Sequence, residues 1–116
     1  MSVANASTGN VCGTTMEGWQ ICVNITGSGL HINSMKGWVH NKTGMRWAGL
    51  HIELKGPKGL IKNCPQFALA NNLNSPNCIW SPNANEPAGS YCTILWFRLQ
   101  DGTFVSEGSK CAGVHR

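Results

Sequence analysis

Residues 91–111 read YCTILWFRLQDGTFVSEGSKC, and this stretch decides the fold that we expect. Asp101-Gly102 lies between two apolar runs, a pattern that favours a two-residue hairpin turn with positive φ at both central positions. That turn places Cys92 opposite Cys111 and so predicts a disulfide across the hairpin base. The same register makes them a hydrogen-bonded pair, whereas cross-strand disulfides favour the closer non-hydrogen-bonded pairs, so we expect a bulge at Gly108 to relax the spacing.

Alternating apolar and polar residues predict further strands before this hairpin. The expected strands cover residues 19–26, 30–40, 45–55, 60–64 and both arms of the 91–111 hairpin. We expect a Gly27-Ser28 turn between the first two strands, and direct pairing of the second and third with Trp38 opposite Trp47. The hairpin is expected to turn one face to the core, formed by Leu95, Phe97, Leu99 and Phe104.

Six to seven such strands predict an all-β antiparallel sandwich or partly open barrel, immunoglobulin-like in general architecture. Residues 1–116 are expected to form a single secreted domain, with residues 1–11 as a flexible arm. Asn and Pro dominate residues 65–87, which predicts one long loop, interrupted by a helical turn at 66–70 and a short edge strand at Ile79-Trp80. Tyr91, followed directly by Cys92, is similar to the tyrosine corner of immunoglobulin-like domains, where the Tyr stands two residues before the Cys.

The six cysteines predict three disulfides and an oxidising, extracellular compartment. The pairings that we expect are Cys12–Cys22, Cys64–Cys78 and Cys92–Cys111. The N-terminal residues lack the basic segment and apolar core of a signal peptide, so we interpret the chain as a mature secreted protein. N-glycosylation sequons begin at Asn5, Asn24 and Asn41.

Charge and hydropathy exclude several partners. The net charge is +4, but the nine cations form no run, so nucleic acid is an unlikely partner. No apolar segment approaches the roughly 20 residues that span a bilayer, so no membrane span is expected. No cofactor is expected either, because CxxC and HxxxH pairs are missing from the sequence.

Few acidic residues limit the possible catalysis. Asp101 is the only aspartate, and the six cysteines are expected to be paired, which argues against triads, carboxylate pairs and thiol nucleophiles. His and Glu acid–base chemistry remains, and its residue types resemble those of small fungal guanyl-specific ribonucleases in their order along the chain. The resemblance implies a catalytic set of His40, Glu53, Arg98 and His115. A weaker metal-binding alternative combines His31, His51 and Glu53.

Binding is the better-supported function. Sugar C–H faces stack on Trp rings, and sugar hydroxyls pair with Asn and Arg, so an exposed Trp beside an Asn-rich loop suits a glycan. The ligand-binding residues that we expect are Trp80, Trp96, Arg98, Asn83 and Asn85. We therefore predict a secreted binding protein that acts on an extracellular protein or glycan without catalysis, as an effector, a toxin or a lectin-like module. The alternatives are the ribonuclease and a protease inhibitor that uses the Cys64–Cys78 loop.

Overall fold

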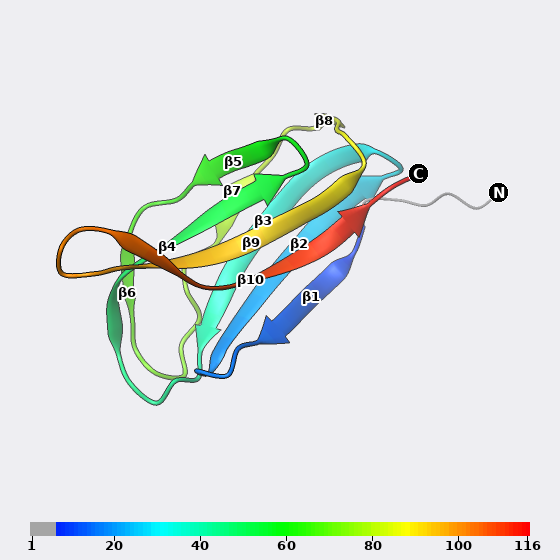
Figure 1. Cartoon of the computed structure of the whole chain (residues 1–116). Coiled ribbons are helices and arrows are strands. Elements are labelled where there is room, and N and C mark those ends of the chain that lie inside the picture. Colours follow the sequence, from blue (N-terminus) through cyan, green and yellow to red (C-terminus); the bar gives the residue numbers. More distant parts are fainter. Residues whose placement is uncertain (1–6) are drawn as a thin grey trace.

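A computed structural model of the protein describes residues 7–116, and these residues form two antiparallel β-sheets without a helix (Figure 1). The strands are β1 (Gly9–Thr14), β2 (Trp19–Ser28), β3 (His31–Asn41), β4 (Trp47–Gly56), β5 (Gly59–Asn63), β6 (Phe67–Leu69), β7 (Cys78–Trp80), β8 (Ala84–Asn85), β9 (Gly89–Arg98) and β10 (Phe104–Val114). Within residues 7–116, therefore, no helix is long and apolar enough to cross a membrane.

The two sheets pack face to face, which confirms the predicted all-β sandwich. Sheet A has the order β1-β2-β3-β7 with β8 also beside β3, and sheet B has the order β10-β9-β4-β5 with β6 also beside β4. Residues 9–11 belong to β1 and pair with the edge of β2. The flexible arm predicted for residues 1–11 is therefore wrong for residues 9–11. Residues 1–6 lie outside the described part.

All three predicted disulfides are present. Cys12–Cys22 joins directly paired residues of β1 and β2, and Cys92–Cys111 does the same for β9 and β10. Cys64–Cys78 instead links the chain just after β5 in sheet B to the start of β7 in sheet A. Two disulfides thus hold strands within a sheet, and the third holds the two sheets together.

The β9–β10 turn contains three residues, so the predicted two-residue turn is wrong. The amide of Leu99 donates to the Thr103 carbonyl at 2.7 Å, and the amide of Gly102 donates to the Leu99 carbonyl at 3.0 Å. Gly102 has a φ of 90°, as the last position of a three-residue loop requires. Asp101 Oδ1 accepts hydrogen bonds from the amide and hydroxyl of Thr103, which stabilises this wider turn.

The extra turn residue moves Phe104 off the core face. Phe104 lies opposite Arg98, and directly paired residues share a sheet face, so its ring points outward. Leu99 is also exposed, because the hairpin extends beyond the end of the sandwich (Figure 1). Of the four residues that we predicted on the core face, Leu95 and Phe97 pack there.

A bulge restores the predicted pairing of Cys92 with Cys111. The register shifts between Ser106 and Gly108, close to the expected position. The bulge takes up one position of the ladder, which converts the cysteine pair from a hydrogen-bonded to a non-hydrogen-bonded one. Their Cα atoms accordingly lie only 4.0 Å apart.

The β2–β3 turn lies two residues later than predicted. β2 continues through Ser28, and the turn is formed by Gly29 and Leu30. Gly29 has a φ of 60°, which the first central residue of a tight hairpin turn needs. A register shift between Thr26 and Gly27 then places Ile25 opposite Met35, and both side chains are buried.

The predicted pairing of Trp38 with Trp47 is wrong because β3 and β4 belong to different sheets. β3 already pairs with β2 and β7, and β4 with β9 and β5, so the connection between them crosses the sandwich. Trp38 faces outward from sheet A, with Lys36 Nζ 5.1 Å from its ring centre. Trp47 points inward, where its ring lies 5.8 Å from Trp19 and 5.0 Å from Phe97.

The long Asn- and Pro-rich connection is more ordered than predicted. Phe67–Leu69 is strand β6, so the expected helical turn is wrong, whereas the short edge strand at Ile79-Trp80 is confirmed as part of β7. Between them, Ser75 is buried, and its hydroxyl accepts a hydrogen bond from the amide of Val39 at 2.9 Å. The segment pairs with β3 and β4 because their backbone groups need partners.

Candidate functional site

An aromatic cluster lies on the outward face of sheet B, and we call its three residues, His51, Trp96 and Phe104, the sheet B aromatic cluster. His51 and Trp96 are directly paired across β4 and β9, with ring centroids 6.4 Å apart and planes only 12° from parallel. Phe104, from β10, meets the His51 ring edge-on at 4.7 Å. The neighbouring residues Ile52 and Leu95 are buried, so strand alternation turns the cluster toward solvent.

Polar groups surround this cluster. A shallow depression of about 310 Å³ is lined by His51, Glu53, Asn63, Trp96 and Phe104. Burial lowers the pKa of His51, while the charge of Glu53 raises it in part. A neutral imidazole, which can donate and accept hydrogen bonds, is therefore favoured at neutral pH.

Arg98 extends the site toward the tip of the hairpin. It follows Trp96 by two residues on β9, so both side chains belong to the outward face of the sheet. Arg98 is exposed, and it lies opposite Phe104. The structure thus brings together two of the five predicted ligand-binding residues, Trp96 and Arg98.

The other three predicted ligand-binding residues lie elsewhere. Trp80 packs against the core at the edge of sheet A, and its ring stacks on Tyr91 at 6.3 Å. Asn83 Oδ1 lies 3.0 Å from His31 Nε2, and Asn85 pairs with His31 in the β-ladder. The five predicted residues therefore do not share one surface, because β7 and β8 belong to sheet A while β9 belongs to sheet B.

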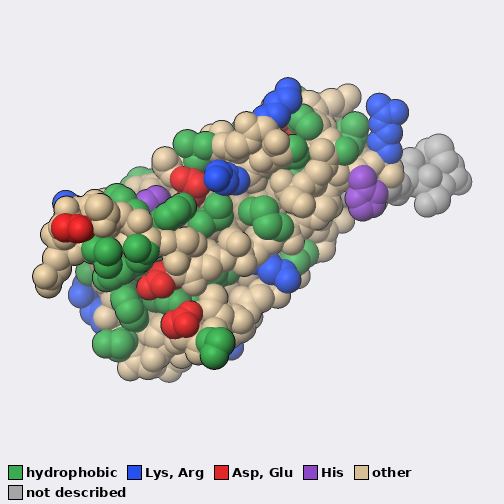
Figure 2. All heavy atoms as spheres, in the orientation of Figure 1, with side chains coloured by type: hydrophobic (Ala, Val, Ile, Leu, Met, Phe, Trp, Pro, Cys, Tyr) green, Lys and Arg blue, Asp and Glu red, His purple; other side chains and the backbone are tan. Residues whose placement is uncertain are grey.

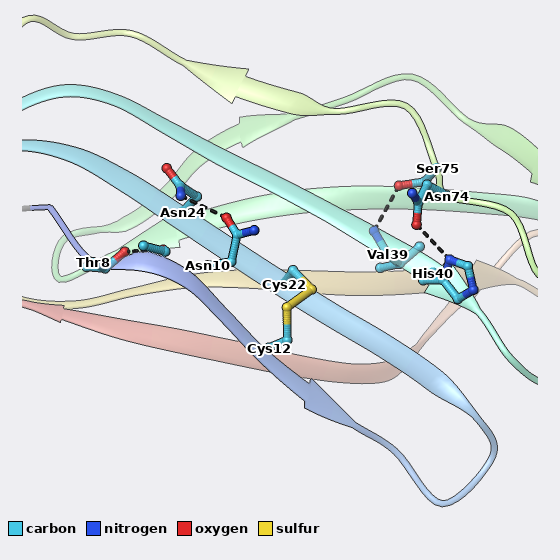
Figure 3. Close-up of a disulfide and its surroundings, with 10 residues drawn as sticks. Thr8, Asn10, Cys12, Cys22, Asn24, Val39, His40, Asn74 and Ser75 are labelled. Atoms are coloured by element: carbon cyan, nitrogen blue, oxygen red, sulfur yellow. Dashed lines mark hydrogen bonds between the residues drawn. A yellow bond between two sulfur atoms is a disulfide. The ribbon is translucent and has the colours of Figure 1, made fainter.

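The four side chains of the ribonuclease alternative do not form one site. His40 faces outward from sheet A, where its Nδ1 lies 2.7 Å from Asn74 Oδ1 (Figure 3). Glu53 and Arg98 face outward from sheet B, on the opposite side of the sandwich. His115 follows the last strand, at the end of the chain.

The weaker metal-binding alternative is separated in the same way. His31 belongs to sheet A, whereas His51 and Glu53 belong to the outward face of sheet B. Among residues 7–116, no three His, Cys, Asp or Glu side chains come together in a way that could hold a metal ion.

The Cys64–Cys78 loop is bound to the rest of the fold through its backbone. The amide of Asn72 donates to the Asn41 carbonyl, and the amide of Asn41 donates to the Leu73 carbonyl at 3.0 Å. The amide of Ser75 donates to the Val39 carbonyl at 2.8 Å. A protease-inhibitor loop needs extended backbone free to pair with the protease, and this loop has already used these groups.

Two of the three sequons lie in the described part, and their asparagines differ. Asn41 is fully buried: its Nδ2 donates to the carbonyls of Met45 and Leu69, and its Oδ1 accepts from the amide and hydroxyl of Thr43. A glycan on Asn41 is incompatible with this arrangement. Asn24 faces outward from β2 and donates only to Asn10 Oδ1, at 2.9 Å (Figure 3). Asn5 lies outside the described residues.

Sequence reasoning missed the contribution of His51 and Phe104 to an aromatic surface. The metal-binding alternative uses His51 only as a ligand, although the outward direction of its side chain follows from the alternation of β4. The predicted two-residue turn places Phe104 on the core face, because it is one residue shorter than the turn in the structure. Asn63 was also missed, since pairing of Glu53 with Asn63 depends on a register shift within the β4–β5 hairpin.

Comparisons with known proteins add no relative. No protein-family model, no curated protein and no solved structure matches this chain. A function therefore has to be inferred from the fold and from the surfaces of the sandwich.

Proposed function

We propose that the protein is a secreted binding domain that uses the outward face of sheet B to recognise an extracellular glycan or protein, without catalysis of its own. The sheet B aromatic cluster is the single observation that carries this proposal. A sandwich normally turns the polar side of an antiparallel sheet to water, and here two aromatic rings and an imidazole occupy that side. The three disulfides are consistent with an extracellular location.

A glycan is the ligand that this surface favours. The rings of Trp96 and Phe104 offer apolar faces for sugar C–H groups. Glu53, Asn63 and neutral His51 line the same depression and supply acceptors and donors for hydroxyls. The depression is shallow, which suits one or two sugar rings resting on the sheet.

A protein ligand is the second candidate, and Arg98 favours it. Trp and Arg are enriched at the centres of protein interfaces, and Trp96 and Arg98 are adjacent on one face of β9. Phe104 is 37% exposed beside them and adds apolar area. Such a partner would cover the flat sheet rather than the depression alone.

Calorimetry with oligosaccharides and cell-wall polysaccharides would test the glycan ligand. We expect binding that Trp96→Ala or Phe104→Ala weakens at least about tenfold, the loss of one good stacking contact. Trp38→Ala is the matched control, because Trp38 is a half-buried Trp on the outward face of the other sheet. Equal losses in Trp96→Ala and Trp38→Ala, or no binding by any saccharide, would overturn the glycan ligand.

A further inference from the structure

A pocket of about 70 Å³ lies at the end of the sandwich nearest the C-terminus (Figure 1). Elements of both sheets line it: the β4–β5 turn and the start of β5 from sheet B, Trp80 of β7 from sheet A, and Tyr91 of β9. Glu86 and Pro87, which follow β8, complete the lining. The pocket shares no lining residue with the depression beside the sheet B aromatic cluster, so it is a separate site.

Stacking and hydrogen bonds hold two walls of this pocket in place. The Trp80 ring stacks on the Tyr91 ring at 6.3 Å, and the Tyr91 hydroxyl donates to the Pro87 carbonyl. The amide of Glu86 donates to the Leu30 carbonyl at 2.9 Å, which ties the segment after β8 to the β2–β3 turn. These contacts fix the walls within the fold, so a ligand would bind with little ordering cost.

Two glycines let the β4–β5 turn form the remaining wall. A Cβ on Gly89 would stand 2.7 Å from Pro57 Cγ, so the turn packs directly against the start of β9. A Cβ on Gly56 would stand 3.0 Å from Ile61 Cδ1 and from Tyr91 Cε2. The shape of the pocket therefore depends on the absence of side chains at these two positions.

The pocket combines an apolar lining with two charges of opposite sign. The apolar residues of the lining are Pro57, Leu60, Ile61, Trp80, Pro87 and Tyr91. Lys58 and Glu86 line the same pocket; Lys58 is exposed, and Glu86 is half-buried. Within residues 7–116, neither of these two side chains forms an ion pair or a hydrogen bond. Both charges are therefore available to a ligand.

These two charges do not result from a crowded charged surface. Only 12% of the residues are charged, and Figure 2 shows charged side chains spread over the visible face of the sandwich. Burial raises the pKa of Tyr91, and the charge of Glu86 raises it further, so the Glu86 carboxylate lies near the Tyr91 phenol. The carboxylate is thus placed to pair with a cation that enters the pocket.

We propose that this pocket binds a free amino acid with a short apolar side chain. Glu86 pairs with the ammonium group of the ligand, and Lys58 pairs with its carboxylate. The ligand side chain contacts Trp80 and the other apolar residues of the lining. An interior segment of a peptide carries neither charge on its backbone, and a simple ion pairs with only one of the two residues. A ligand that holds both charges beside a short aliphatic group uses all three features.

The volume of the pocket limits the side chain of the ligand. A cavity of about 150 Å³ holds benzene, so a pocket of about half that size suits about three or four carbon atoms. Valine and proline have side chains of this size. This site does not depend on the ligand of the sheet B aromatic cluster.

An NMR titration of the ¹⁵N-labelled protein with L-valine is the test. We expect saturable shifts of amide signals from residues 56–61 and 86–91 and of the Trp80 indole signal, while the Trp96 indole signal stays in place. Two analogues separate the charges: isovalerate is valine without its ammonium group, and isobutylamine is valine without its carboxylate. The missing ammonium group should weaken binding at least about tenfold, because Glu86 is half-buried. The missing carboxylate should weaken it about threefold, since Lys58 is exposed.

Two variants assign each charge to its residue. Glu86→Gln should weaken L-valine binding about tenfold and bind isovalerate at least as well as the parent does. Lys58→Met should weaken L-valine binding about threefold and bind isobutylamine at least as well as the parent does. Glu17→Gln is the matched control, because it removes an acid from the β1–β2 loop and should leave L-valine binding unchanged.

Each outcome supports or overturns the amino-acid site. Shifts confined to the pocket, with losses that follow the deleted charge, support it, whatever ligand binds at the sheet B aromatic cluster. The absence of any saturable shift at the pocket would overturn it. Equal binding of L-valine, isovalerate and isobutylamine, or L-valine binding that Glu86→Gln leaves unchanged, would also overturn it.

Discussion

Gly37 of β3 lies directly against Thr93 of β9 across the middle of the sandwich. A Cβ on Gly37 would stand 2.5 Å from Thr93 Oγ1 and 2.8 Å from Leu54 Cδ2. The absence of a side chain at this position therefore lets sheets A and B approach each other where Thr93 is fully buried. The sheets can approach this closely because Gly37 has no side chain. The backbone freedom of a glycine is not needed here, because the φ of Gly37 lies outside the left-handed region.

We predict that Gly37→Ala destabilises the protein by about 1–3 kcal/mol, the usual cost of overpacking a core. Urea unfolding followed by Trp fluorescence would measure it. Gly113→Ala is the control, since a Cβ there meets nothing closer than 3.9 Å, and its stability should change little. The Gly37→Ala cost should shrink in a Thr93→Ala background, because the two side chains compete for the same space. Equal costs in both backgrounds would contradict this contact.

Asn41→Ala should destabilise the protein by about 1–3 kcal/mol, because the carbonyls and donors that its amide satisfies would be left without partners. Asn24→Ala is the matched control: its amide makes one exposed hydrogen bond, so we expect a change within about 0.5 kcal/mol. Chemical unfolding of both variants would check the difference. Equal, small losses of stability in both variants would show that the buried hydrogen bonds of Asn41 do not stabilise the fold.

The sequence predicted much of the fold because its strongest signals are local. Alternation identified the long strands, and the disulfide pairings followed from the expected proximity of cysteines along the chain and across the hairpin. The turn types were less certain: Asp-Gly suits a two-residue loop and also the last two positions of a three-residue loop. The shorter turn places Phe104 on the wrong face of the predicted hairpin. The bulge near Gly108 shifts the register back by one residue, so the predicted pairing of Cys92 with Cys111 is nevertheless correct.

The candidate site was less predictable because it depends on the assignment of strands to sheets. The residues around Trp80 and Trp96 do not indicate which of the two rings faces the core. Trp80 packs against the core at the edge of sheet A, whereas Trp96 lies on the outward face of sheet B. The predicted pairing of Trp38 with Trp47 is wrong for the same reason, since it assumes that strands consecutive in the chain lie in one sheet. Only the pairing of non-neighbouring strands, such as β9 with β4, brings His51 next to Trp96.

Tyr91, the only tyrosine, should titrate above its ordinary pKa of 10.0. Burial raises the pKa of Tyr91, and the charge of Glu86 raises it further. Its hydroxyl also donates to the Pro87 carbonyl at 2.5 Å, the bond expected of a tyrosine corner. The stability linked to this group is present below pH 10 and is lost as the pH rises through the folded-state pKa.

Phenolate absorbance of the native and urea-unfolded protein would measure this shift directly. We expect the native midpoint to lie at the higher pH. Tyr91→Phe should cost about 0.5–1.5 kcal/mol, the net contribution of one hydrogen bond. Coincident native and unfolded titrations would contradict the burial of the phenol.

Glu107→Gln should stabilise the protein at neutral pH. Burial at the β10 bulge raises the pKa of Glu107 above 4.5, and the nearby charge of Glu17 raises it further. The folded state therefore holds the Glu107 proton more tightly than the unfolded state does. The resulting stability is complete below pH 4.5 and is lost as the pH rises through the folded-state pKa.

Urea unfolding should accordingly show Glu107→Gln to be more stable than the parent at neutral pH, with the difference disappearing in acid. Glu17→Gln should shift stability in the same direction but by less, because it removes only the repulsion from Glu17 and leaves Glu107 buried. A Glu107→Gln protein that loses stability at neutral pH would show instead that the carboxylate is favourably bound at the bulge.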